Sequence, residues 1–163
     1  MILQCSSAEE IQLLYPATPQ WAVVEDGTLV ELVRHDRIEP SCAGLALGEM
    51  ACRKHRDSWI LAAWLLDEED ADVWLRTSAL GTVLSHSVLL GFDMGVRLVA
   101  HCDVYMLDSL VVAVNDACQG ELLDELRHHP LIPLLKQRIA SLDGLVLPHA
   151  DLAIFEHYLG AIS

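Results

Sequence analysis

Positively charged residues are scarce in this 163-residue chain. It has 10 Lys and Arg against 24 Asp and Glu, a formal net charge of −14 at pH 7, and its two lysines are Lys54 and Lys136. Nucleic-acid binding needs several Lys or Arg side chains on one face to neutralise phosphates. The charge balance therefore argues against direct binding to nucleic acid, phosphate or an anionic membrane, and it favours a basic protein as partner.

The chain also lacks the short motifs of common chemistries. It contains no glycine-rich phosphate loop, no His-Glu-x-x-His, no Gly-x-Ser-x-Gly and no Cys-x-x-Cys. An odd number of cysteines argues against a closed disulfide framework. The five are Cys5, Cys42, Cys52, Cys102 and Cys118. The N-terminus has no basic region followed by a long apolar one, so we expect no secretory signal. We predict a cytoplasmic protein with reduced thiols, no cofactor and no metal ion.

Apolar residues are abundant, at 53% of the chain with a mean hydropathy of +0.34. Disorder requires low hydrophobicity together with high charge, so this chain should fold. Its length is that of one ordinary domain, and we predict a single, mainly α-helical globular domain over residues 1–163. The longest weakly charged stretch, residues 80–100, is interrupted by Asp93 and Arg97, so we expect no membrane span.

Residues 1–40 are predicted to form a short helix followed by a β-hairpin. Ser7 and Glu10 stand at the spacing of a capping box, which predicts the start of a helix. An Asp-Gly pair at residues 26–27 then separates two apolar runs. Such a pair is a strong signal for a two-residue hairpin turn. An isolated hairpin is marginally stable, so we expect this one to pack on helices.

Helical signals dominate residues 42–163, which we predict to form a helical bundle. The run 59–66 is apolar on every face, as expected of a central helix. Further helices are predicted over 73–90 and 96–114, and the chain ends in an amphipathic helix over 152–162. The all-round apolar run and the C-terminal apolar stripe are suited to a symmetric contact between two copies, so we expect a homodimer.

Negative charge is concentrated in residues 66–126, which hold twelve acidic and two basic side chains. Its densest part has five carboxylates within six residues. These are Asp67, Glu68, Glu69, Asp70 and Asp72. Like charges at this density destabilise the folded state by self-repulsion, and a cationic partner would relieve it. The basic residues gather elsewhere, and one such cluster is Arg53, Lys54 and Arg56.

Two tryptophans, Trp64 and Trp74, flank the five carboxylates. An aromatic side chain beside charged residues is a typical anchor of a protein interface. We therefore predict that the five acids and the two tryptophans form the partner-binding surface. Two alternatives stay open. The acids can be a solvated face that keeps an apolar chain soluble, and the tryptophans can pack in the core.

The sequence supports two functional interpretations of different classes. The first is a small acidic protein that inhibits a basic partner such as a toxin, a nuclease or another nucleic-acid enzyme. It would be an immunity-, antitoxin- or phage-type inhibitor, including one that mimics nucleic acid. The second is a helical hydrolase or metal-dependent enzyme in which folding brings together His101, Asp103, His149, Asp151 and His157. The first requires an exposed acidic cluster, and the second requires at least three of those side chains to converge.

Overall fold

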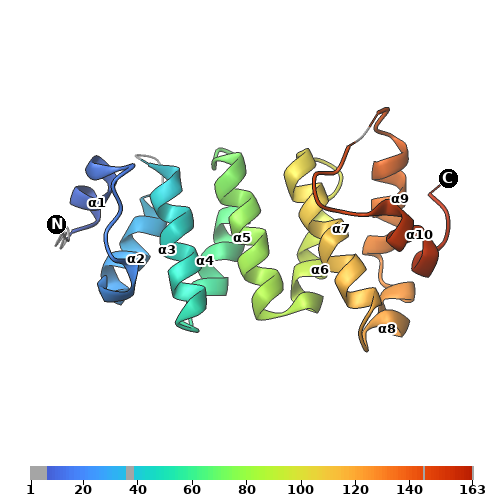
Figure 1. Cartoon of the computed structure of the whole chain (residues 1–163), viewed down its shortest axis with the longest axis horizontal. Coiled ribbons are helices and arrows are strands. Elements are labelled where there is room, and N and C mark those ends of the chain that lie inside the picture. The colour runs from blue at the N-terminus through green and yellow to red at the C-terminus, as the bar shows by residue number, and fades with distance from the viewer. Residues whose placement is uncertain (1–6, 36–38, 145, 163) are drawn as a thin grey trace. The chain divides into compact units, whose positions relative to one another are not determined.

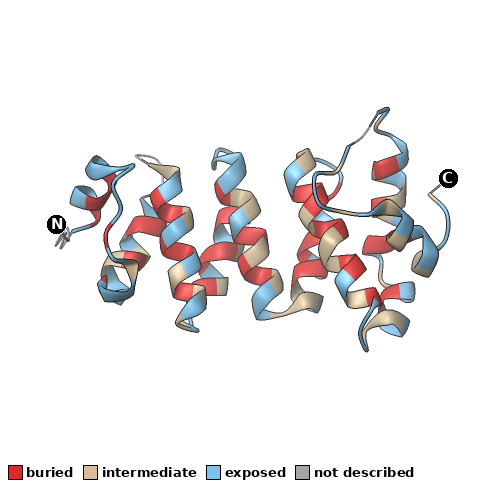
Figure 2. Cartoon of the chain, viewed as in Figure 1, coloured by how far each residue is buried: buried red, intermediate tan, exposed pale blue. Residues whose placement is uncertain are grey.

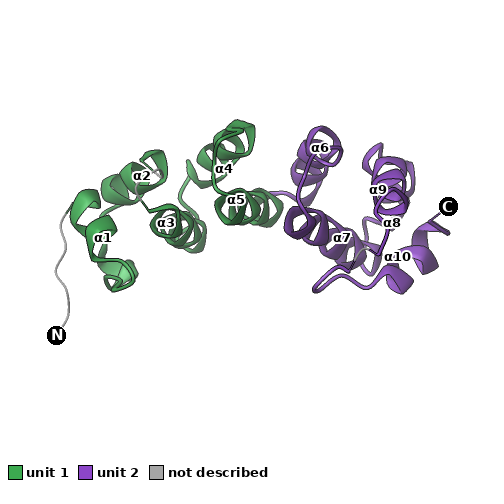
Figure 3. Ribbon diagram, turned by 90° about the horizontal axis from the view of Figure 1, so that it is seen from above, with its two compact units in different colours: residues 1–86 green, residues 87–163 purple. Residues whose placement is uncertain are grey.

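The computed structural model describes residues 7–35, 39–144 and 146–162 (Figure 1). Over these ranges the chain forms ten α-helices and one short 3-10 helix, with no strand, which confirms the prediction of a mainly α protein. No helix in the same ranges is long and apolar enough to cross a membrane. The chain divides into two compact units, Met1–His86 and Ser87–Ser163 (Figure 3). The single domain over residues 1–163 stays a prediction.

Unit 1 is built around one helix, α3, which packs on α2 and on α5, while α4 packs on α5 (Figure 1). Its elements are α1 (Ala8–Leu14), the 3-10 helix η1 (Trp21–Val23), α2 (Asp26–Arg34), α3 (Pro40–Cys52), α4 (Ser58–Asp67) and α5 (Val73–His86). On α3 the buried residues Cys42, Ala46 and Met50 recur every four positions. This spacing gives a helix one continuous apolar stripe, and Figure 2 shows the buried residues of the unit along the faces where its helices meet.

The predicted β-hairpin is wrong, because residues 26–34 form α2. Leu29, Leu32 and Val33 are fully buried, and their spacing of three and four residues is that of a helix. Asp26 lies in the first turn, where the helix dipole favours a carboxylate. A two-residue hairpin turn of this type needs a positive φ at its glycine, and Gly27 does not have one. Burial of the apolar face outweighs the local turn signal.

The start of α1 is confirmed, whereas the expected burial of α4 is wrong in part. The Ser7 side chain accepts a hydrogen bond from the Glu10 backbone N–H at 3.2 Å, which caps α1. On α4, Leu61 and Leu65 are buried, but Ile60 is exposed. The helix therefore keeps an apolar exposed face, and a homodimer through that face stays a prediction.

Unit 2 is centred on α7, which packs on α6, α8 and α10, while α9 packs on α6 and on α8. Its helices are α6 (Val88–Leu98), α7 (Val104–Cys118), α8 (Leu123–His128), α9 (Leu131–Ala140) and α10 (Leu152–Leu159). Gly95 on α6 permits a close approach of its neighbours. A Cβ there would lie 2.9 Å from Leu110 Cδ2 and 3.2 Å from Leu131 Cδ1. The buried thiols Cys102 and Cys118 pack with the apolar residues of this unit.

The predicted helices 73–90 and 96–114 are wrong in their bounds. Ser87 caps α6 by accepting the Leu90 backbone N–H at 3.3 Å, so the first predicted helix is divided there. Asp103 caps α7 and divides the second. Both side chains satisfy backbone donors that a new helix leaves without an intrahelical partner. A short polar residue inside an apolar run thus marks a helix start in this chain.

Candidate functional site

The predicted acidic cluster lies between the end of α4 and the start of α5. Asp67 is the last residue of α4, and Asp72 directly precedes α5. We call residues 67–72 the acidic loop. Four of its five acidic residues are exposed and Glu68 is half-buried. The carboxylates therefore face water, as the binding interpretation requires.

Asp72 sets the direction of the first turn of α5. Its Oδ1 accepts hydrogen bonds from the backbone N–H groups of Trp74 at 2.9 Å and Leu75 at 3.2 Å. This is an N-cap, which satisfies donors at the start of a helix. Leu75 is buried in the core, and neighbouring residues on a helix point about 100° apart. Trp74 is consequently directed outward and is 60% exposed.

Trp64 is also at the surface. It lies on α4, three residues before the acidic loop, and is 39% exposed. The alternative that both tryptophans pack in the core is therefore wrong. Two large aromatic side chains with water-accessible surface flank a group of carboxylates, which is the composition predicted for the partner-binding surface.

A cavity of about 470 Å³ opens beside Trp74. We call it the Trp74 groove. Trp74 and Tyr15 give it aromatic walls, and Asp72 and Glu39 supply carboxylates. The remaining lining residues are Pro40, Ser41, Gly44, Leu45, Leu75 and Ser78. No basic side chain is among the described residues that line it, so the groove is both acidic and aromatic.

The two carboxylates of the groove are helix caps. Glu39 Oε1 accepts the Ser41 backbone N–H at 3.1 Å and caps α3, as Asp72 caps α5. A carboxylate has about four acceptor positions on two oxygens, so capping does not use its full capacity. A guanidinium or ammonium group can be held by such acceptors and by the face of an indole or phenol ring. The groove is suited to a cationic side chain.

Sequence reasoning found Asp72 and Trp74 but missed Glu39 and Tyr15. Both missed residues are far from residue 72 in the sequence. Glu39 reaches the groove because α3 packs on α5, and Tyr15 reaches it from the end of α1, which packs on α2. The sequence contains one weak signal for Glu39 as a helix cap. Glu39 immediately precedes Pro40, and proline is common at the first position of a helix, so an acidic cap could have been expected there.

No protein-family model, curated protein or solved structure matches this chain. Its function is therefore inferred from its own residues.

The five residues of the enzyme interpretation all lie in unit 2, where several have structural contacts of their own. Asp103 caps α7, and Asp151 caps α10 by accepting the Ala153 backbone N–H at 2.8 Å. His157 lies on α10 with its ring edge-on to Tyr158. His101 is exposed in the turn before α7. Within residues 7–35, 39–144 and 146–162, no group of three or more His, Cys, Asp or Glu residues is arranged to hold a metal ion.

His149, the fifth of these residues, contacts Asp108, which the sequence analysis did not single out. The Asp108 side chain is 5% exposed, and its Oδ2 lies 2.7 Å from His149 Nδ1. Its Oδ1 accepts the backbone N–H groups of His149 at 3.0 Å and Ala150 at 2.8 Å. Burial alone would raise the pKa of Asp108, but these hydrogen bonds outweigh burial and lower that pKa. The contact ties the segment before α10 to α7.

Proposed function

We propose that this chain binds a basic protein in the cytoplasm and inhibits it through the acidic loop and the Trp74 groove. The observation that carries the proposal is the exposed indole of Trp74 beside the carboxylates of Asp72 and Glu39. In a chain with a net charge of −14, this site combines negative potential with a large aromatic contact area. Those are the two properties of a surface that recognises a cationic protein.

The two parts of the site have different roles. The acidic loop is exposed and lies at the rim, so it mainly accelerates association by attracting the partner over a distance. The Trp74 groove is concave and takes one basic side chain of the partner, preferably arginine, whose planar guanidinium can stack on an aromatic ring while donating to carboxylates. The acidic loop therefore sets the rate of association, and the contacts in the Trp74 groove set the lifetime of the complex.

Inhibition follows from how the partner uses its own positive charge. Enzymes that act on nucleic acids hold the phosphate backbone with Lys and Arg side chains. Five carboxylates within six residues present negative charges to those same side chains, and a protein bound there covers the surface where nucleic acid would lie. This favours a toxin, a nuclease or another nucleic-acid enzyme as the target, with the chain as an immunity-, antitoxin- or phage-type inhibitor that mimics nucleic acid.

The proposal is tested by affinity capture from a lysate of the native cell with three baits. The first is the unaltered chain. In the second the acidic loop is neutralised but the cap Asp72 is kept, through Asp67→Asn, Glu68→Gln, Glu69→Gln and Asp70→Asn. In the third four exposed acids of unit 2 are neutralised, through Asp116→Asn, Glu121→Gln, Asp124→Asn and Glu125→Gln. The two variants have equal net charge, so only the location of the charge differs.

We expect the unaltered chain and the unit 2 variant to retain the same basic protein at about 50 mM salt and to lose most of it at about 500 mM, where charges are strongly screened. The acidic-loop variant should retain little at either salt concentration. The captured protein, purified, should lose its activity on nucleic acid when the unaltered chain is added. Equal capture by both variants would contradict the proposed site, and undiminished activity would contradict inhibition.

A further inference from the structure

A second cavity in unit 1 has the opposite charge. It has a volume of about 480 Å³ and lies where α3 ends, α4 begins and α5 ends. We call it the Trp59 pocket. Two of the described residues that line it, Lys54 and Arg56, are cations, and none is a carboxylate. The other lining residues are Ala51, His55, Ser58, Trp59, Thr82, Ser85 and His86.

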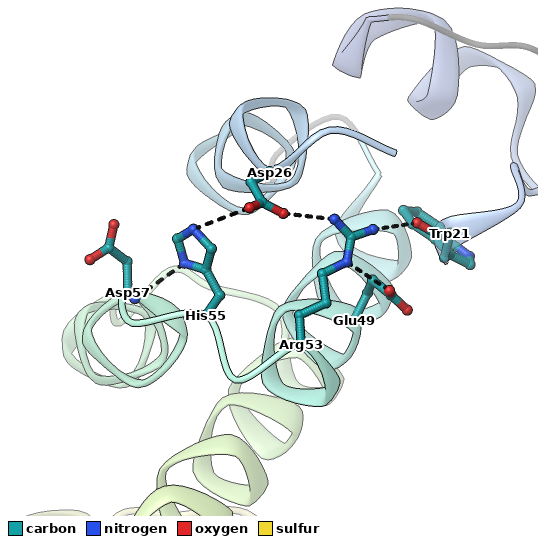
Figure 4. A network of polar contacts seen from close by, with 6 residues as sticks. All are labelled: Trp21, Asp26, Glu49, Arg53, His55 and Asp57. Atoms are coloured by element: carbon teal, nitrogen blue, oxygen red, sulfur yellow. Dashed lines mark hydrogen bonds and ion pairs between the residues drawn. The ribbon is translucent and has the colours of Figure 1, made fainter. Parts of the chain in front are cut away.

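Arg53, the residue before Lys54, holds two carboxylates at the end of α3 (Figure 4). The Arg53 guanidinium donates to Asp26 Oδ1 at 2.7 Å, to Glu49 Oε1 at 2.8 Å and to the Trp21 carbonyl at 2.8 Å. The second oxygen of Asp26 lies 4.0 Å from His55 Nε2. Asp26 and Glu49 are thus paired with Arg53 and His55, and no ion pair of Lys54 is found among the described residues.

The ion pair of Arg56 lies at the surface. Its Nε lies 3.5 Å from Asp57 Oδ1, and the Arg56 side chain is 91% exposed. An ion pair this exposed contributes little and exchanges readily with other anions. The Asp57 backbone N–H also donates to His55 Nδ1 at 3.2 Å, which holds the imidazole in place in the pocket wall (Figure 4). Arg56 is therefore available to a bound anion.

Lys54 occupies a backbone position that favours glycine. Its φ is 55°, in the left-handed region. The Lys54 N–H donates to the Ala51 carbonyl at 3.0 Å, and the His55 N–H donates to the Met50 carbonyl at 2.9 Å. These two bonds form the Schellman ending of α3, where glycine is the usual residue at the position of Lys54. Replacing Lys54 by glycine therefore removes the ammonium group without straining the backbone.

The pocket also has a planar aromatic wall. Trp59 on α4 and His86 at the end of α5 stack with ring centroids 5.1 Å apart and planes 9° apart. Three hydroxyl side chains, those of Ser58, Thr82 and Ser85, are also in the lining. Cations and hydroxyls hold phosphate oxygens, whereas an aromatic wall favours a planar ring.

We propose that the Trp59 pocket binds an aromatic phosphate ester of mononucleotide size, with its phosphate at Lys54 and Arg56 and its ring at the Trp59–His86 wall. The volume lies in the range of small-ligand sites. The net charge of the chain predicted repulsion of phosphate, but net charge averages over the whole surface, whereas the nearest charges set the potential inside a pocket. This site is separate from the acidic loop, since the two lie at opposite ends of α4.

Calorimetric titration of the full chain with adenosine monophosphate tests this proposal, with inorganic phosphate and adenosine as the two halves of the ligand. The indole N–H signal of Trp59, assigned with Trp59→Phe, reports by NMR whether the ligand reaches the aromatic wall. Lys54→Gly removes one of the two pocket cations. Arg127→Gln is the control, since it changes the charge equally at an exposed position in unit 2.

We expect adenosine monophosphate to bind more tightly than either half and to shift the Trp59 signal. Lys54→Gly should weaken binding about tenfold, the loss typical of one charge-assisted hydrogen bond, without lowering the thermal unfolding temperature. Arg127→Gln should leave binding unchanged. The proposal is overturned if no binding occurs at millimolar ligand, if inorganic phosphate binds as tightly as the nucleotide, or if Lys54→Gly binds like the unaltered chain.

Discussion

The side chain of Asp72 accepts the backbone N–H of Trp74 at 2.9 Å and so fixes the helix turn that directs the Trp74 indole to the surface. One carboxylate of the acidic loop is thus a structural cap as well as a surface charge. Its contribution to stability must be separated from its contribution to binding. The substitutions Asp72→Asn and Asp72→Ala make this separation, because asparagine caps helices as well as aspartate and alanine does not.

We predict that Asp72→Ala lowers the free energy of unfolding by about 1 kcal/mol, the usual effect of losing an N-cap. Asp72→Asn keeps the acceptor oxygen and should stay close to the unaltered chain. Urea unfolding followed by circular dichroism measures both values. Equal destabilisation by the two substitutions would mean that the charge of Asp72, and not its capping bond, stabilises α5.

Trp74→Ala should weaken partner binding by about 2 kcal/mol or more, the effect of removing an interface anchor. The same substitution should change the free energy of unfolding by no more than about 0.5 kcal/mol, since the side chain is largely exposed. Leu13→Ala is a matched control, because Leu13 is an exposed apolar residue of unit 1 outside the groove lining. Titration calorimetry with the captured partner gives the comparison, and equal losses from the two variants would refute an anchor at Trp74.

The contact between Asp108 and His149 makes stability depend on pH. The pKa of Asp108 in the folded state lies below its ordinary value of about 4, so the contact stabilises the fold at neutral pH and loses this effect as the pH falls through the folded-state pKa. Asp108→Asn should lower the free energy of unfolding at pH 7 by about 2 kcal/mol, the effect of disrupting a buried charged acceptor.

Chemical denaturation at a series of pH values from neutral to acid measures this effect. The difference between the unaltered chain and Asp108→Asn should be largest at neutral pH and should shrink at acid pH. A constant difference over the whole series would show that the charge of Asp108 does not contribute. His149→Ala should lower the free energy of unfolding by less than Asp108→Asn does. The His149 ring is 78% exposed, and the two backbone N–H groups that donate to Asp108 remain.

Substitution by alanine should have opposite effects on stability at two helical glycines, Gly95 and Gly81. A Cβ at Gly95 would lie 2.9 Å from Leu110 Cδ2, so Gly95→Ala should destabilise the chain by about 1–3 kcal/mol through overpacking. A Cβ at Gly81 on α5 has nothing within 4 Å, so Gly81→Ala should stabilise it by about 0.5–1 kcal/mol through helix propensity. The thermal unfolding temperatures of both variants show whether each substitution stabilises or destabilises the chain. Destabilisation of similar size at both sites would contradict the packing described for α6.

The helical class, the start of α1 and the exposed acidic loop could be predicted because each depends on neighbouring residues. The hairpin at residues 26–27 was mispredicted for the same reason. An Asp-Gly pair is a strong local signal, but Leu29, Leu32 and Val33 are fully buried, and only a helix places all three on one face. These three residues are buried where α2 packs on α3, and a short stretch of sequence around residues 26–27 does not include α3.

The long-range parts of the candidate site could not be predicted. Glu39 and Tyr15 join Asp72 and Trp74 only through the packing of α3 on α5 and the placement of α1. The same holds for the contact between Asp108 and His149. The sequence contained a partial signal for the Trp59 pocket, since Arg53, Lys54 and Arg56 were recognised as a basic cluster, but their pairing with Asp26 and Glu49 required the fold.

Site-specific photo-cross-linking tests the central claim most directly. A benzophenone amino acid replaces Val73 in one chain and Leu13 in another, which are both exposed apolar residues, so that Trp74 itself is kept. Each chain is irradiated in a lysate of the native cell before the products are identified by mass spectrometry. We predict a cross-link from position 73 to one basic nucleic-acid enzyme, lost at high salt and absent from position 13. The same products from both positions, or acidic proteins alone at position 73, would contradict this prediction.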